Sequence, residues 1–175
     1  MLAAQLINTS FPSVHLLDKA SFALQLMEDY DLQHLCVTTD EKLVGIVDKN
    51  ALLDTDETAV IASLQDEFIM ASVHADAHFL EASSLLSLHE LTMLPVVSTA
   101  ADLLGVITAK HMLTILTSYL GADTKGGVIV LEMERKQYSF GEIVRLIETN
   151  DAYVTQLNTA NDPQTGMLLV TIKIN

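Results

Sequence analysis

The sequence contains one cysteine, Cys36, and no tryptophan, and only 9 of its 175 residues are lysine or arginine. A single cysteine cannot form an intramolecular disulfide, a CxxC redox pair or a zinc cluster, so we expect a reducing compartment, the cytoplasm. The 23 acidic residues give a formal net charge of -14. Because this charge repels phosphate backbones and anionic lipids, we expect neither nucleic-acid nor membrane partners.

Targeting segments and catalytic motifs are also missing. The first residues show no basic stretch followed by a long apolar one, and no later apolar run approaches the length of a membrane span, which favours an intracellular protein. There is no nucleophile elbow, P-loop, G-x-G-x-x-G or HExxH motif. Cys36 lies in an apolar run and is expected to be an inert core residue. We therefore predict a protein that is not an enzyme and that carries no cofactor and no metal.

What the sequence does contain is an internal repeat. Three blocks occur twice, in the same order: Ser13–His15 and Ser72–His74, Leu35–Val37 and Leu94–Val96, Leu43–Val47 and Leu103–Ile107. The last pair is separated by one residue more than the other two, which places an insertion in the turn between the blocks. A repeat of this length is one supersecondary unit. With two copies, the simplest way to bury both apolar faces is to pack one copy against the other.

Each copy predicts the element order β-α-β-β-α. Apolar stripes at helical spacing indicate the helices, and β-rich runs joined by polar turns indicate hairpins. In the first copy these are Val14–Leu16, a helix at Ser21–Tyr30 with Phe22, Leu26 and Met27 as its stripe, and strands Gln33–Thr38 and Lys42–Val47. In the second they are Val73–Ala75, a helix at Phe79–His89 with Ala82, Leu85, Leu86 and Leu88, strands Thr92–Val97 and Asp102–Thr108, and a closing helix Ala109–Leu120 that Gly121 ends.

The tail has a different pattern, β-α-β-β, which makes the whole chain α+β. A strand at Val128–Glu134 precedes a helix that the capping-box pair Ser139 and Glu142 begins and that runs to Thr149. Two further strands follow, at Tyr153–Thr159 and Met167–Ile174. In the last strand the apolar residues alternate with Thr171 and Lys173, which indicates one buried face.

Taken together, the element order, the repeat length, the segment Leu94–Val97 and the segment Gly105–Thr108 make residues 2–121 resemble a tandem pair of cystathionine-β-synthase (CBS) motifs. The resemblance implies a CBS pair at 1–122, with motif one at about 1–60 and motif two at about 61–122. The tail, 126–175, resembles the first part of a ferredoxin-like ACT domain, as a small β-α-β-β unit. CBS pair plus ACT is the layout of acetoin-utilisation regulatory proteins.

The ACT resemblance has two consequences. An ACT domain continues through another helix and a fourth strand that this sequence does not reach, so we expect one unpaired sheet edge. The loop Arg135–Tyr138 lacks the acidic residue and the glycine of amino-acid-binding relatives, so no amino-acid site is assigned.

Candidate ligand residues follow from the CBS resemblance. In relatives that bind adenosyl compounds, the last strand of a motif ends in Gly-apolar-apolar-Ser/Thr-x-x-Asp, whose hydroxyl and carboxylate bind ribose. The second copy keeps the hydroxyl as Thr108 but has His111 at the aspartate position, and Lys110 between them could pair with a phosphate. In the first copy Asp48 replaces the hydroxyl and Ala51 the carboxylate. One cleft therefore retains nucleotide-binding chemistry and the other is degenerate.

Structural roles explain the same residues. Thr108 and Asp48 precede helices, where Thr and Asp serve as N-caps, and Lys110 fits an exposed helix position. His74, Asp76 and His78 alternate and could face a metal from one strand, but we favour a solvated surface for them.

The resemblance implies a regulatory module that binds a small molecule, such as AMP, ATP or S-adenosylmethionine, between its CBS motifs and forms a homodimer. The alternative is a dimerisation or adaptor module with degenerate ligand sites.

Overall fold

The computed structural model describes residues 1–175. It divides into two compact units, Met1–Leu113 and Thr114–Asn175, and the division falls within helix α4 (Ala109–Tyr119). The domain boundary predicted between residues 122 and 126 stays a prediction. None of the helices combines the length and the apolar character that crossing a bilayer requires.

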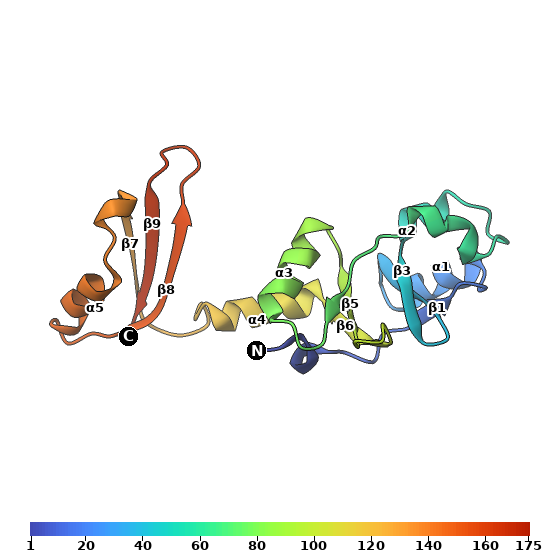
Figure 1. Cartoon of the computed structure of the whole chain (residues 1–175), viewed down its shortest axis with the longest axis horizontal. Coiled ribbons are helices and arrows are strands. Elements are labelled where there is room, and N and C mark those ends of the chain that lie inside the picture. The colour runs from blue at the N-terminus through green and yellow to red at the C-terminus, as the bar shows by residue number, and fades with distance from the viewer. The chain divides into compact units, whose positions relative to one another are not determined.

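The predicted repeat is present as two copies of one fold (Figure 1). The first copy consists of β1 (Ser13–His15), α1 (Ala20–Asp29), β2 (His34–Thr39), β3 (Lys42–Asp48) and the short α2 (Lys49–Leu53). The second consists of β4 (Val73–His74), α3 (Phe79–Leu88), β5 (Met93–Val97), β6 (Leu103–Thr108) and α4. Short 3-10 helices, η1 (Ala3–Leu6) and η2 (Ile61–Glu67), precede the copies.

Both copies build the same three-stranded sheet. The order is β1-β2-β3 in the first copy and β4-β5-β6 in the second, with the first pair parallel and the second pair an antiparallel hairpin. In the first hairpin both turn residues, Asp40 and Glu41, have positive φ angles of 49° and 65°. Such a turn matches the twist of the two strands, which agrees with the predicted hairpin.

The segments that precede each copy are exchanged between the copies. The Asn8 backbone N–H donates to the Val106 carbonyl at 2.8 Å, and the Val106 N–H donates back at 3.0 Å, so the N-terminal segment pairs with β6 of the second copy. Ile69, which precedes the second copy, makes the same reciprocal pair with Ile46 of β3, at 2.9 and 3.1 Å. Each copy thus completes the other's sheet region.

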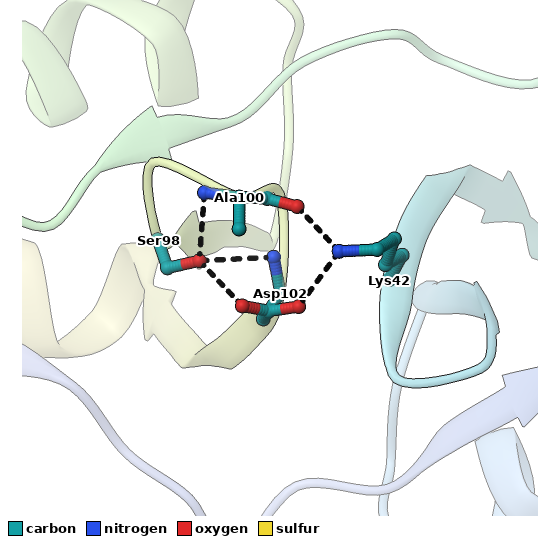
Figure 2. Close-up of polar contacts among 4 residues, drawn as sticks. All are labelled: Lys42, Ser98, Ala100 and Asp102. Atoms are coloured by element: carbon teal, nitrogen blue, oxygen red, sulfur yellow. Dashed lines mark hydrogen bonds and ion pairs between the residues drawn. The ribbon is translucent and has the colours of Figure 1, made fainter.

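The two hairpin turns contact each other directly (Figure 2). Lys42 Nζ donates to the Ala100 carbonyl at 2.6 Å and to the Asp102 carboxylate at 3.0 Å, and the Ser98 hydroxyl donates to the same carboxylate. These hydrogen bonds from Lys42 and Ser98 lower the pKa of Asp102. Lys42 and Asp102 directly precede equivalent blocks of the repeat, so pairing two identical copies through these turns would bring like charges together.

Both copies contribute to one core. Met93 and Val106 of the second copy belong to the same buried cluster as Leu35, Cys36 and Val47 of the first. Burial raises the pKa of the Cys36 thiol to about 12, as expected for an inert core cysteine.

The predicted helix stripes are wrong at individual positions. Phe22 is 47% exposed and Leu88 73% exposed, whereas Ala20, Ala23 and Met27 are fully buried. In α1 the small residues Ala20 and Ala23 face the core together with Met27 of the predicted stripe, and their small size lets the helix approach the sheet closely.

The second unit forms an antiparallel sheet in the order β7-β9-β8, from β7 (Gly127–Met133), β8 (Val154–Asn161) and β9 (Leu168–Ile174). Helix α5 (Phe140–Glu148) starts at Ser139, whose hydroxyl accepts the Glu142 N–H at 3.4 Å as the capping pattern predicts. The buried face of β9 carries the predicted apolar residues Leu168, Val170 and Ile172. Apolar residues of β7, β8 and α5 pack against them.

The face of β9 opposite the apolar residues was expected to be polar and exposed, but Lys173 on that face is only 9% exposed. Its ammonium donates to the Gly121 carbonyl and, at 2.6 Å, to the Thr124 carbonyl. Gly121 has a φ of 64°, and both carbonyls belong to the turn that follows α4, so the lysine ties this turn to β9.

We expect Lys173→Met to destabilise the second unit by about 2 kcal/mol, since it removes a charged donor from two carbonyls and keeps the side-chain length. Amide hydrogen exchange of β9 should then accelerate by about 30-fold. The exposed Lys136→Met is the matched control and should leave the exchange unchanged. Equal exchange in both variants would contradict a stabilising role for the two hydrogen bonds of Lys173.

Candidate functional site

The first unit contains a cleft of about 390 Å³ between its two copies. The loop after α1 and the segment before β1 line one side, and the ends of β5 and β6 line the other. The residues involved are Phe11, Tyr30, Asp31, Leu32, Thr92, Thr108, Ala109 and Lys110. The cleft therefore brings together two of the predicted ligand residues, Thr108 and Lys110.

Thr108 lies where β6 ends and α4 begins. Its hydroxyl oxygen accepts the His111 backbone N–H at 3.1 Å, so the side chain acts as an N-cap, as the structural alternative predicted. A hydroxyl oxygen has a second lone pair and its own hydrogen, and these remain for a ligand. Capping and ligand binding are compatible at this residue.

The other two predicted residues lie elsewhere. His111 is exposed and lines a neighbouring hollow of about 430 Å³ with the N-terminal residues Gln5–Thr9. Asp48 does not line the Thr108 cleft. Its carboxylate accepts the Asn50 N–H at 2.7 Å, which makes it the N-cap of α2, and its other oxygen lies 3.4 Å from His34 Nε2.

The cleft lining suits a ligand that has an apolar ring and polar substituents. Phe11, Tyr30 and Leu32 offer apolar surface, on which a planar base could pack. Thr92 and Thr108 supply hydroxyls and Asp31 a carboxylate, which can bind ribose hydroxyls.

Sequence reasoning missed the side of the cleft that comes from the first copy, and it also missed Thr92 of the second copy. Tyr30 and Asp31 end α1 in a turn where Asp31 has a φ of 53°, and Glu90 has the same geometry in the second copy, with a φ of 52°. The polar residue Thr92 directly precedes the buried strand Met93–Val97. The sequence could have indicated these residues through the turn that occurs in both copies beside a buried strand. The pattern does not show, however, which of the two turns lines the cleft.

His74, Asp76 and His78 do not form a metal site: no group of three potential metal-binding side chains comes together in residues 1–175. His78 precedes α3, and its ring nitrogen accepts the Leu80 N–H.

These features agree with a comparison against protein families. A family model described as "CBS domain" matches residues 3–57 and 66–118, more than half of the chain. The chain therefore belongs to the CBS domain family, with its CBS pair at residues 3–118. CBS domain pairs are regulatory modules, generally not catalytic ones. A search of curated proteins finds no match.

Solved structures show the same fold. A CBS domain pair/ACT domain protein from Thermotoga maritima has a TM-score of 0.63 at 23% identity, covering 69% of this chain and 100% of that one. CBSX2 in complex with AMP has a TM-score of 0.58 at 20% identity, covering 67% and 97%. The cytosolic domain of a Mg²⁺ channel in complex with ATP has a TM-score of 0.57 at 19% identity, covering 65% and 48%.

The predicted fold, a tandem CBS pair followed by a small ACT-like β-α-β-β unit, is confirmed. The similarity to acetoin-utilisation regulators stays a prediction.

Proposed function

We propose that this chain is a non-catalytic regulatory module that senses an adenosyl compound in the cleft between its CBS motifs. The proposal rests on one observation: Thr108 and Lys110 line the same cleft as the aromatic residues Tyr30 and Phe11. The aromatic side chains would hold the base, the hydroxyls and Asp31 the ribose, and Lys110 a phosphate. Structures of the same fold were solved with AMP and with ATP, which supports this ligand class.

The buried Cys36 supports a non-catalytic role. Its thiol stays protonated at neutral pH, because its pKa is raised to about 12, so it offers no thiolate nucleophile.

Ligand-induced stabilisation tests the proposal. We expect AMP, ADP, ATP or S-adenosylmethionine to raise the unfolding free energy by about 2.7 kcal/mol at about a hundredfold the dissociation constant. Thermal unfolding measured with each compound, and with amino acids for comparison, gives the result. If no adenosyl compound shifts the transition, the sensor proposal fails and the adaptor alternative is favoured.

Thr108→Ala should abolish the ligand shift, and the matched variant Thr108→Ser should retain it, because serine keeps the hydroxyl. The alanine variant also loses the cap of α4 and should be less stable without ligand by about 1 kcal/mol. Each variant's shift is therefore measured against its own ligand-free transition. A full shift in Thr108→Ala would remove Thr108 from the site.

One observation supports a degenerate ligand site in the first copy, which is one part of the adaptor alternative. Asp48, which stands where a ligand-binding hydroxyl would be, has both carboxylate oxygens in contact with protein groups. We propose that this position is structural, and that a single cleft binds the ligand. The proposed assembly is a homodimer in either case, and light scattering that returns a monomer mass would contradict it.

A further inference from the structure

A buried histidine connects the candidate cleft to the first CBS motif. His34 is 6% exposed on β2, and its ring lies between Asp48 of the same motif and Thr92 of the other. Nε2 is 3.4 Å from the Asp48 carboxylate, and Nδ1 is 2.8 Å from the Thr92 hydroxyl oxygen. Of these three connected residues, Thr92 is the one that lines the cleft.

The backbone decides which ring nitrogen carries the proton. The Thr92 backbone N–H points at His34 Nδ1 from 3.3 Å. Because an N–H can only donate, Nδ1 must be the unprotonated acceptor, and the proton of the neutral ring sits on Nε2, facing Asp48.

The same argument orients the Thr92 hydroxyl. Two lone pairs would repel at 2.8 Å, so the hydroxyl donates its hydrogen to Nδ1. Both lone pairs of the hydroxyl oxygen are then left for the cleft. Thr92 thus enters the cleft as an acceptor.

We propose that His34 is a positioning residue that holds the Thr92 hydroxyl as a hydrogen-bond acceptor, and so selects ligands that bring an amino or hydroxyl donor to Thr92. The inference rests on the proposed function, since it requires that the cleft bind a ligand. A protonated ring would reverse the arrangement: Nδ1–H would donate to Thr92, and the hydroxyl hydrogen would turn toward the cleft.

The surroundings keep the ring neutral at physiological pH. Burial lowers the pKa of His34 below 6.5 and outweighs the opposite effect of the Asp48 charge. On the other side of the ring Thr92 is uncharged, and Asp31 and Lys110 are the charged residues of the cleft it lines. Because the folded-state pKa is lowered, the corresponding stability is present above pH 6.5 and is lost as the pH falls through the folded pKa.

The tautomer can be tested without a ligand. Nitrogen-15 NMR of the imidazole should show the Nε2–H form at about pH 7.5 and a pKa below that of an unperturbed histidine. A ring protonated on Nδ1, or charged at that pH, would overturn the inference whatever the cleft binds.

The binding experiment uses adenosine, which has no phosphate group whose charge would change with pH. Its affinity, measured by calorimetry, should fall about tenfold from about pH 7.5 to one unit below the measured pKa of His34. Thr92→Val should lower the affinity about tenfold at the higher pH and abolish the pH dependence, and Thr92→Ser should restore both. His34→Leu should also abolish the pH dependence of the affinity. If His34 had a purely structural role, the pH dependence would persist in this variant.

The outcomes separate the two proposals. If wild-type protein binds none of the adenosyl compounds, the proposed function is wrong. If it binds adenosine equally at both pH values, or if Thr92→Val keeps the wild-type pH dependence, His34 does not act through Thr92 and the inference fails alone.

Discussion

Met93→Ala is expected to destabilise the first unit by about 2–5 kcal/mol, the range for truncating a fully buried methionine. Met93 is 0% exposed and lies on β5 of the second motif, yet it belongs to a buried cluster made mostly by the first motif. The variant should therefore weaken both motifs together. The cleft would be lost with them, because its two sides come from different motifs.

Cys36 provides the measurement, since it is the only cysteine, is 0% exposed and lies in the first motif. Its alkylation requires the core to open, so its rate reports the stability of that core. In Met93→Ala this rate should rise more than tenfold, because each 1.4 kcal/mol corresponds to a factor of about ten.

Leu88→Ala is the control in the same motif. Its side chain is 73% exposed, so the rate should stay within about twofold of wild type. An unchanged Cys36 rate in Met93→Ala would mean that the motifs unfold independently, contrary to the shared core.

Gly105→Ala is the second substitution for which we expect a large loss of stability. Gly105 has a φ of 141°, and an added Cβ would lie 2.6 Å from Ile7 Cγ2 and 2.8 Å from the Asn8 carbonyl oxygen. Backbone strain and displacement of the paired N-terminal segment should together cost about 2–4 kcal/mol. Chemical unfolding of the variant measures this cost. Amide exchange at Asn8 should also accelerate, because its N–H pairs with Val106.

Gly45→Ala is the matched variant at the equivalent position of the first motif. No positive φ applies there, and the nearest atoms to an added Cβ are side-chain atoms of Phe68, at 2.9 and 3.1 Å, and of Met70. Phe68 Cβ can move only with its own backbone, so the substitution has a steric cost here too, but it adds no backbone strain, and we expect a smaller loss than in Gly105→Ala. Gly141→Ala, with nothing within 4 Å, should gain about 0.5 kcal/mol. Equal losses at Gly45 and Gly105 would contradict the role of the left-handed backbone.

Local patterns predicted most of the secondary structure. The alternation in β9 put Leu168, Val170 and Ile172 on one face, and the structure buries all three. Gly121 was predicted to end the last helix of the repeat, and α4 ends at Tyr119, just before this glycine and its positive φ. Such features depend on neighbours in the chain, so a short stretch of sequence contains the information.

The candidate site was predicted only on one side. Thr108 and Lys110 could be identified because the stretch that begins at Gly105 resembles the ligand-binding stretch of CBS relatives. The other polar residues of the cleft, Tyr30, Asp31 and Thr92, come from other elements, and nothing in their own sequence pattern indicates that they lie near Thr108. Asp48 was correctly predicted as a possible cap, but its contact with His34 was not foreseen.

The sequence by itself determined that the chain holds two copies of one unit and a third, different one, because repeats and periodicities are properties of order along the chain. Only the tertiary structure decided how the copies complete each other: Asn8 pairs with Val106, Ile69 with Ile46, and His34 with Thr92. Backbone hydrogen bonds are chemically alike at every residue, so partners far apart in sequence are selected by packing of the whole core rather than by any local pattern.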